Sequence, residues 1–274
     1  MRAKRVLVIV AHADDMEFMA GGTIAKMAAL GYDIREVIAT NNERGTLDPT
    51  WETRFTADTR REEARCGAKA LGVNPDVEFL GYEDGYLSDT PLNVLRERCI
   101  RAIRAHRPDI LFTWDPFAPY EEHGDHRSIG LAATEATSFA HFPLYHREHR
   151  DDGLEPHYVG ERYFFAKSPR DANKIVDISE FIGRKVDALC EHTCQMEMTI
   201  KDLQAAVAAS GLDVPFLADA DPKAYRPVVE AQIKAWAGAV GRREGFAYGE
   251  EFRRTRFGGV ERWLQAGTSP PDDL

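Results

Sequence analysis

The stretch Val6-Leu-Val-Ile-Val-Ala11, which runs directly into His12-Ala-Asp-Asp-Met-Glu17, decides the fold. Six consecutive apolar residues, several of them β-branched, are typical of a strand that is buried on both faces, as in a parallel sheet. Later segments continue the pattern, with strands expected at residues 34–40, 77–80 and 110–113 and helices at 57–71 and 92–106. This alternation predicts an α/β fold with a Rossmann-like, mainly parallel β-sheet flanked by helices.

The remaining elements are less regular. Gly21-Gly22 should open the first helix, over Thr23–Leu30, and further strands are expected within residues 161–178. A helix should run from Glu180 into the 200s, and another should cover residues 224–240. These segments form the C-terminal α/β additions to the core.

A length of 274 residues suits one domain, and we expect a single domain over residues 1–274. Its expected parts are a core with the functional site at 1–140, a surface insertion at 141–160, C-terminal strands and helices at 161–257, and a tail at 258–274. The insertion holds four histidines among many charged residues, and these histidines are expected on a solvated surface.

Composition and charge argue against several classes of protein. Lys+Arg is 35 and Asp+Glu is 45, giving a net charge of −10, which disfavours a partner made of nucleic acid or anionic membrane. No apolar run approaches the roughly 20 residues that cross a bilayer, so we expect a cytoplasmic protein. The four cysteines form no CxxC pair and are expected as free thiols. Cys190 and Cys194 would share a helix face from which His192 points away, which argues against a metal site there.

Ionisable side chains follow two of the expected strands. His12, Asp14 and Asp15 come directly after the first strand, and His123 and His126 follow the fourth. In open α/β sheets, ligands bind beyond the carboxyl ends of the strands. If the two strands are neighbours, His12, Asp15 and His126 meet there, as two imidazoles and one carboxylate with a fourth position open. That donor set suits a catalytic zinc ion.

The two clusters resemble the LmbE-like / PIG-L family of zinc-dependent N-acetylglucosamine deacetylases. The resemblance rests on Val8–Glu17 (VIVAHADDME), Gly21–Ile24 (GGTI) and His123–His126 (HGDH). Further matching patches are Arg60-x-x-Glu63, Gly81–Gly85, Lys185–Gln195 and Gly245–Phe252. The segments Asp115–His123, Pro156-His157 and Ile175–Ile178 are similar to the diacetylchitobiose-deacetylase branch.

The resemblance implies a role for each site residue. His12, Asp15 and His126 would bind one zinc ion per chain, although other divalent metals fit the same donors. Asp14 would be the general base, His123 would act as an acid or stabilise the oxyanion, and Asp125 would orient His123. Contacts with the sugar are implied for a further four residues, Glu43, Arg44, Arg60 and Asp84.

Two positions depart from the family pattern. Ala13 and Gly124 stand where the family has proline, which leaves both loops less restricted in φ. All the ligand-type and titratable residues of the pattern are present. We therefore expect these departures to affect the fine adjustment of the site or the choice of substrate more than the reaction itself.

The implied reaction is hydrolysis of an N-acetyl amide on a GlcNAc-containing sugar, such as N-acetylglucosamine or diacetylchitobiose. The products would be acetate and a free amine. The resemblance also implies a homo-oligomer, a trimer or a hexamer.

Three other functions compete with this interpretation. The same centre could serve an amidase of a thiol conjugate or an antibiotic-type intermediate, because a zinc site does not specify what surrounds the amide. A non-catalytic sugar-binding protein would have no need of Asp14 and His123. A nucleotide-binding Rossmann protein is disfavoured because the turn lacks GxGxxG and because Asp14 and Asp15 would repel a pyrophosphate.

Overall fold

The computed structural model describes residues 2–256 and 260. Within these residues, seven strands form one sheet in the order β3-β2-β1-β4-β5-β7-β6. The strands are β1 (Arg5–Val10), β2 (Asp33–Thr40), β3 (Glu78–Tyr82), β4 (Ile110–Trp114), β5 (Glu161–Phe165), β6 (Lys174–Asp177) and β7 (Gly249–Arg256). The pairs from β3 through β5 are parallel, whereas β7 is antiparallel to both β5 and β6. The predicted mainly parallel sheet is confirmed.

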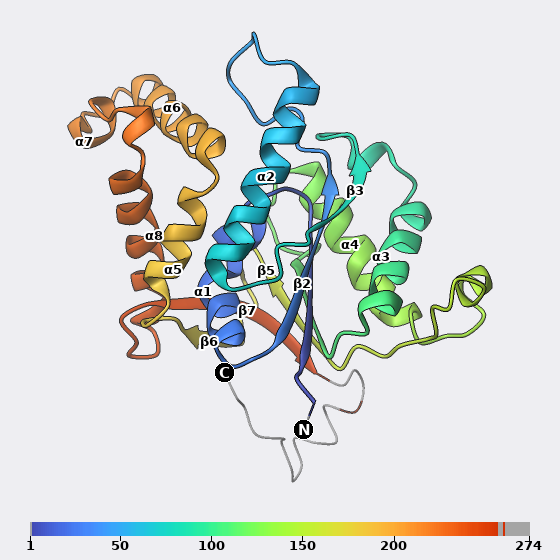
Figure 1. Ribbon diagram of the computed structural model, residues 1–274. Helices are drawn as coiled ribbons and strands as arrows, with labels where there is room; N and C mark the ends of the chain where they lie inside the picture. Colours follow the sequence, from blue (N-terminus) through green and yellow to red (C-terminus); the bar gives the residue numbers. More distant parts are fainter. Residues whose placement is uncertain (1, 257–259, 261–274) are drawn as a thin grey trace.

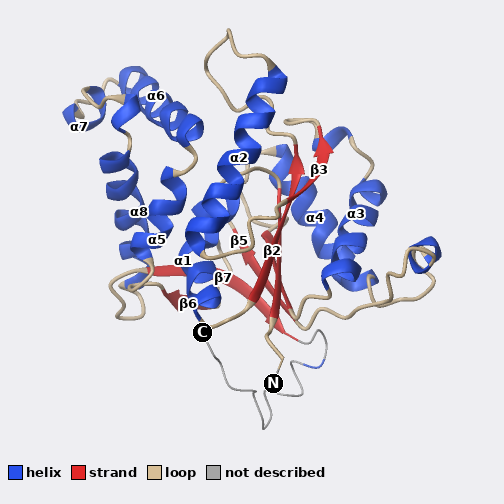
Figure 2. Ribbon diagram, in the orientation of Figure 1, coloured by secondary structure: helices blue, strands red, loops and turns tan. Residues whose placement is uncertain are grey.

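Helices cover both faces of the sheet. They are α1 (Asp15–Ala29), α2 (Thr53–Leu71), α3 (Leu92–His106), α4 (Gly124–Phe139), α5 (Ile182–Cys190), α6 (Thr193–Ser210), α7 (Pro215–Ala218) and α8 (Arg226–Gly241). Short 3-10 turns lie at Leu87–Asp89, Arg147–Arg150 and Pro222–Ala224. In Figure 1, α1, α2 and α5 lie on one side of the sheet and α3 and α4 on the other. Figure 2 shows the strands enclosed between these two layers.

The centre of the sheet explains the apolar sequence of the first strand. Val6 to Val10 are at most 1% exposed, because β1 is flanked by β2 and β4 and covered on both faces. Farther along the sheet, the Phe112 ring stacks on Tyr163, with ring centroids 4.6 Å apart. Since β1 and β4 are parallel neighbours, the loops after their carboxyl ends lie side by side.

The predicted start of the first helix is wrong. Helix α1 begins at Asp15, so Gly21 and Gly22 lie inside it. The two glycines allow close packing instead: a Cβ at Gly22 would lie 2.6 Å from Ile178 Cδ1, and one at Gly21 would lie 3.2 Å from Lys185 Cγ. The helix therefore starts among the site residues themselves.

The helix predicted from Glu180 into the 200s is divided. Helix α5 ends at Cys190 and α6 begins at Thr193. His192 lies in the break and is fully buried, so Cys190 and Cys194 lie on different helices and do not share one helix face as predicted. All four cysteines are free thiols, as expected. Strand β7 was not predicted, because its charged sequence does not alternate in the manner of a half-buried strand.

The insertion at 141–160 is anchored to α3. His149 is completely buried, with Nε2 2.7 Å from Glu97 Oε1 and Nδ1 3.2 Å from Arg104 Nη1. Arg104 also donates hydrogen bonds to the carbonyls of Phe142 and Tyr145. The solvated-surface interpretation is therefore wrong for His149. The predicted tail from residue 258 lies, apart from Val260, outside the described residues.

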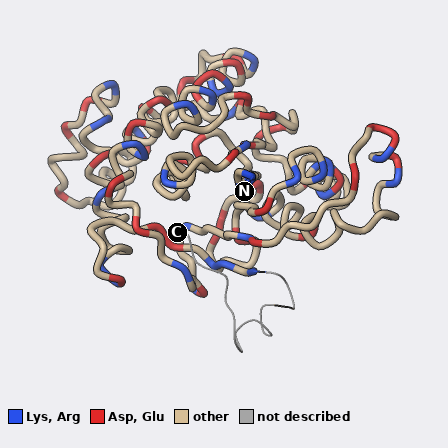
Figure 3. The backbone as a smooth tube through the Cα atoms, turned by 60° about the horizontal axis from the view of Figure 1, so that its bottom comes forward, with Lys and Arg blue, Asp and Glu red and all other residues tan. Residues whose placement is uncertain are grey.

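The described chain contains no helix that combines the length and apolar character of a membrane span. Figure 3 shows acidic and basic residues interspersed along most of its elements.

Candidate metal centre

Three ligand-type side chains meet at the carboxyl ends of β1 and β4. His12 follows β1, Asp15 is the first residue of α1, and His126 lies in the first turn of α4. His12 Nδ1 is 3.2 Å from His126 Nε2, and His126 Nε2 is 3.4 Å from Asp15 Oδ1. His12 Nδ1 and Asp15 Oδ2 are 3.9 Å apart. The neighbouring strands thus bring together the three residues that the sequence analysis singled out as metal ligands.

In each imidazole, the ring nitrogen that points away from the other histidine contacts a carboxylate. His12 Nε2 lies 3.1 Å from Asp84 Oδ1 and 3.3 Å from Asp125 Oδ2. His126 Nδ1 lies 3.1 Å from Glu121 Oε1. A carboxylate on one ring nitrogen fixes the tautomer that leaves the other nitrogen free to bind a metal. His12 Nδ1 and His126 Nε2 are therefore the two candidate donor atoms.

Negative charge dominates this cluster. Burial alone would lower the pKa of His12, but hydrogen bonds to Asp125 and Asp84 raise it to about 10. Burial alone would raise the pKa of Glu121, but contact with His126 lowers it to about 2. Such a field favours a cation between the two imidazoles.

Asp15 is held rigidly. Its Oδ2 accepts hydrogen bonds from the backbone N–H groups of Ala11 and His12, at 3.0 and 2.9 Å, and from Trp114 Nε1 at 2.9 Å. The Trp114 ring also stacks on His126, with centroids 3.8 Å apart. The sequence analysis assigned no role to Trp114 or Glu121. Their positions in the sequence, at the end of the fourth strand and just before His123, could have indicated that both residues lie at the site.

Asp14 points to a different partner from its neighbour Asp15. Its φ of 96° places it in the left-handed region, an unusual conformation for a residue other than glycine. The Asp14 carboxylate is 3.2 Å from Arg60 Nη2. Burial raises the pKa of Asp14, and Arg60 partly opposes that shift. Adjacent carboxylates therefore occupy distinct environments.

His123 caps the N-terminus of α4. Its Nδ1 accepts a hydrogen bond from the backbone N–H of Asp125, at 3.3 Å, and its ring stacks on His126. Burial, together with the charges of His12 and His126, lowers the pKa of His123. A neutral His123 with this bond carries its proton on Nε2.

Asp125, which was expected to orient His123, hydrogen-bonds to it through its backbone N–H, whereas its carboxylate points to other partners. Asp125 Oδ2 contacts His12, and the two oxygens also accept hydrogen bonds from the backbone N–H groups of Gly85 and Leu87, at 2.7 and 3.0 Å. Only the backbone of Asp125 reaches His123. The helical turn that begins at Gly124 directs the carboxylate toward β1 and away from the cap.

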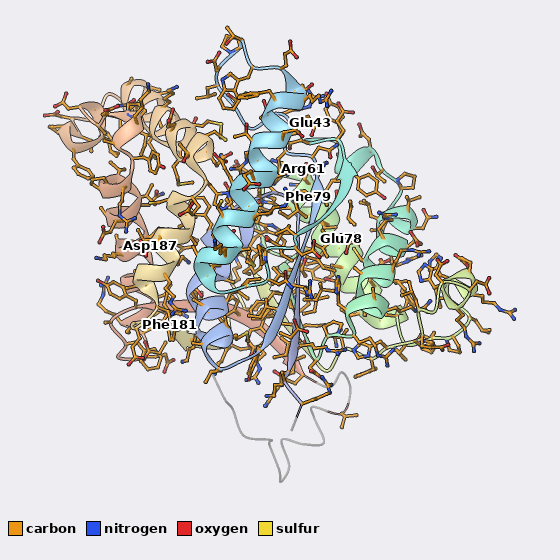
Figure 4. All side chains as sticks on the ribbon, viewed as in Figure 1. Glu43, Arg61, Glu78, Phe79, Phe181 and Asp187 are labelled. Atoms are coloured by element: carbon orange, nitrogen blue, oxygen red, sulfur yellow. The ribbon has the colours of Figure 1, made fainter. Side chains whose placement is uncertain are left out.

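The four expected sugar contacts are placed differently from one another. Arg44, Arg60 and Asp84 line the same cavity as the metal-type cluster, whereas Glu43 is not among its lining residues. Instead, Glu43 Oε1 accepts a hydrogen bond from the Asp84 backbone N–H, at 3.3 Å. Figure 4 places Glu43 near the upper end of α2, above Arg61.

Arg60 is only 1% exposed, so nearly all of its side chain contacts other protein groups. Its Nη1 is 2.9 Å from Glu63 Oε2 and 3.4 Å from His192 Nδ1, and Nη2 also donates to the Ala13 carbonyl. His192 Nε2 is in turn 3.6 Å from Glu17 Oε1. The sequence analysis did not anticipate this buried network behind Asp14, because its members come from α1, α2 and the break before α6.

The cavity in front of the cluster has a volume of about 600 Å³. Its lining residues are His12, Asp14, Asp15, Phe18, Met19, Asn42, Arg44, Gly45, Arg60, Asp84, Gly85, Trp114, His123, His126, Lys167, Gln195, Met198 and Trp236. Metal-type ligands, the buried Asp14 carboxylate and His123 thus face one space.

The fold and the site together define a Rossmann-like α/β protein with a cluster of histidine and carboxylate side chains of the kind that binds a metal. The chain belongs to the PIG-L family, whose sequence model, described as GlcNAc-PI de-N-acetylase, matches residues 7–137. It is 34% identical over 201 residues to the diacetylchitobiose deacetylase of Thermococcus kodakarensis, with 73% of each chain covered.

Two further comparisons agree with that assignment. The 1D-myo-inositol 2-acetamido-2-deoxy-alpha-D-glucopyranoside deacetylase of Actinosynnema mirum is 29% identical, with 70% of this chain and 81% of the relative covered. The structure of N,N'-diacetylchitobiose deacetylase from Pyrococcus horikoshii matches with a TM-score of 0.75 and 28% identity, covering 99% of this chain and 89% of that one. The family resemblance and the assignment to hydrolases of amide C–N bonds are thereby confirmed.

Proposed function

We propose that this enzyme hydrolyses the N-acetyl amide of a GlcNAc-containing sugar, releasing acetate and a free amine, with zinc held by His12, Asp15 and His126. The observation that carries the proposal is the convergence of these three side chains on a cavity that the buried Asp14 carboxylate also lines.

The donor set fits zinc. Tetrahedral zinc with bonds of about 2.0–2.2 Å separates its ligand atoms by about 3.3 Å. His126 Nε2 lies 3.2 Å from His12 Nδ1 and 3.4 Å from Asp15 Oδ1, and both distances are close to that separation. Two imidazoles and one carboxylate are also the ligands of several catalytic zinc sites, which keep one position open. When bound, zinc would acidify water and polarise the acetyl carbonyl.

Asp14 is the residue proposed to take the proton from the attacking water. Asp14 is next in sequence to the proposed ligand Asp15. Its own carboxylate contacts Arg60, so we do not propose it as a metal ligand. Arg60, held by Glu63 and the Ala13 carbonyl, fixes the direction of that carboxylate. A general base held in place in this way needs little reorganisation when the reaction starts.

His123 is proposed to act on the developing charge. Its Nδ1 is occupied by the backbone N–H of Asp125, so Nε2 is the nitrogen that can donate a proton or hydrogen bond. A donor there would stabilise the tetrahedral oxyanion formed when water attacks the amide, or would protonate the leaving amine. Asp84 and Asp125 support the reaction indirectly, by orienting His12.

Arg44 remains the candidate for contact with the sugar hydroxyls, because the buried Arg60 guanidinium is occupied by Asp14, Glu63 and the Ala13 carbonyl. Arg44 is partly exposed at the cavity and stacks over the Tyr86 ring at 4.9 Å. The alternative substrate, an amide on a thiol conjugate or antibiotic-type intermediate, would use the same centre. Rates of acetate release from a panel of acetylated sugars and acetylated non-sugar amides distinguish these two substrate classes.

The test measures acetate release and bound metal on one purified sample. The wild type should release acetate from N-acetylglucosamine or diacetylchitobiose and should hold about one zinc per chain. His126→Ala should lose both, whereas His106→Ala, a surface histidine paired with Glu78, should lose neither. Full metal retention by His126→Ala after mild chelation would contradict the ligand assignment, and acetate release confined to non-sugar amides would contradict the substrate.

A further inference from the structure

The cavity has two chemically different regions. The metal-type cluster and Asp14 supply polar groups, while Phe18, Met19, Met198 and Trp236 supply an apolar surface. Met198 belongs to α6 and Trp236 to α8. Figure 1 shows that these helices stand on the α1 side of the sheet, away from α4, which carries His126.

The cavity is larger than the reaction requires. Cavities of about 300–1,000 Å³ enclose drug-sized molecules. A volume of about 600 Å³ leaves space beyond the single sugar ring whose acetamido group must reach His12 and His126. Met198 of α6 and Trp236 of α8 line this cavity together with His12 and His126.

Trp236 is accessible for contact with a ligand. It is 36% exposed although it lines both the main cavity and a smaller neighbouring one. One face of a pyranose ring presents C–H groups and packs well on an indole, whereas its hydroxyl edge needs hydrogen-bond partners.

Gln195 supplies such a partner beside the aromatic surface. It precedes Met198 by one helical turn and also lines the cavity. Among the described residues, no hydrogen bond to its side-chain amide is found. A Cβ at Gly45 would lie 3.2 Å from Gln195 Oε1, so the loop after β2 closes against α6 at this point. An acyl chain would bury this amide without a partner, at a cost in free energy.

Part of the apolar surface comes from a segment of the chain separate from the metal-type centre, because Met198 and Trp236 belong to α6 and α8, whereas Phe18 and Met19 belong to α1. The match to the family model ends at residue 137, before Gln195, Met198 and Trp236. The groups proposed for the reaction all lie within the match. Recognition of what is attached to the reacting ring can therefore reside in α6 and α8.

We propose that Trp236, Met198 and Gln195 form a subsite for the second pyranose ring of a neutral disaccharide, whose other ring presents its N-acetyl group to His12, Asp14 and His126. This inference rests on the proposed function above. The second ring stacks on Trp236 and hydrogen-bonds the Gln195 amide.

The experiment compares kcat/KM on diacetylchitobiose with kcat/KM on N-acetylglucosamine. Trp236→Ala should lower the disaccharide-to-monosaccharide ratio by about 10-fold, equivalent to the loss of one aromatic stacking contact. Trp236→Phe should recover most of that ratio. Phe216→Ala is the matched control, because Phe216 is an exposed aromatic of α7 outside the cavity lining. Its ratio should stay within about 2-fold of the wild type.

The outcomes separate this subsite from the proposed function. If the wild type releases acetate from neither sugar, the proposed function fails and the subsite fails with it. If the wild type cleaves both but Trp236→Ala leaves the ratio unchanged, or lowers both rates equally, the subsite alone is overturned. Should Trp236→Ala fail to fold, Gln195→Ala supplies the same comparison, with a lower ratio expected and an unchanged ratio overturning the proposal.

Discussion

Asp14 and Asp15 show how two adjacent carboxylates acquire different tasks. Asp15 begins α1 and receives hydrogen bonds from two backbone N–H groups and Trp114. Asp14, with its φ of 96°, turns the other way to Arg60. The left-handed conformation at Asp14 therefore separates the proposed base from the proposed ligand.

Asp14→Asn should reduce turnover by on the order of 100-fold while the metal content stays at the wild-type value. The amide keeps the shape of the side chain and loses the ability to accept the proton. Initial rates of acetate release and metal analysis on the same preparation check this. Near-normal turnover would show that another group takes the proton.

Glu36 gives a second prediction at this scale. It is buried on β2, and neither of its oxygens has a hydrogen-bond partner among the described residues. Burial, reinforced by the charge of Glu17, raises the pKa of Glu36 well above its ordinary value. Above about pH 4.3 the unfolded chain ionises this group while the folded protein keeps it protonated. The free energy of unfolding therefore falls as pH rises.

Glu36→Gln removes that dependence. The stability of the variant relative to wild type should rise between about pH 5 and about pH 8, whatever its offset at low pH. Urea unfolding across this range measures the slope. A difference that stays constant with pH would contradict the assignment of a protonated Glu36.

That the three proposed ligands would lie together could be predicted from the sequence, because they come soon after buried, neighbouring strands. The residues behind them could not. His192 is distant in the chain from Arg60 and Glu63 of α2, and it meets them only after α2 packs beside α5. Asp125 was identified as an orienting group, but its partner depended on the direction of the first turn of α4, which no sequence pattern specifies.

At the scale of elements, a buried ion pair is inserted into α1. Lys185 Nζ lies 2.6 Å from Glu250 Oε1 and also donates to the Phe18 carbonyl, at 2.8 Å. Glu250 accepts hydrogen bonds from the Gly22 and Thr23 N–H groups, at 2.9 and 2.7 Å. Side chains from α5 and β7 thus replace part of the backbone ladder of the helix that carries Asp15.

Removing one partner of this pair should be costly. Glu250→Ala leaves Lys185 buried and two N–H groups without acceptors, so the free energy of unfolding should fall by about 3–5 kcal/mol. The control Asp187→Asn on α5 (Figure 4) breaks an exposed pair with Arg226 of α8 and should cost at most about 1 kcal/mol. Denaturant unfolding of both variants decides, and equal losses would show that burial of the pair is immaterial.

The predicted strands and most helices of the core match the structure because periodicity and length identify such elements. The glycine pair was misread because glycine serves both to end helices and to admit close neighbours. Only the packing of Ile178 and Lys185 shows which role applies here. Strand β7 has an alternating burial pattern only at its start, which explains why periodicity missed it.

At the scale of the whole molecule, we expect a homo-oligomer, a trimer or a hexamer. The insertion exposes several large apolar side chains, namely Phe142, Leu144, Tyr145 and Tyr158. Exposed apolar patches on an otherwise charged chain are typical of contact surfaces. Light scattering at micromolar concentration should give a multiple of the chain mass of 30.8 kDa, and a monomer would contradict the expectation.

The central claim is metal-dependent N-deacetylation at the His12–Asp15–His126 site. Its most direct test is acetate release from diacetylchitobiose by the wild-type protein, before chelation, after chelation, and after return of one equivalent of zinc per chain. Acetate release should disappear on chelation and return with zinc. Release that persists in the fully metal-free protein, or that never occurs with zinc bound, would contradict the account.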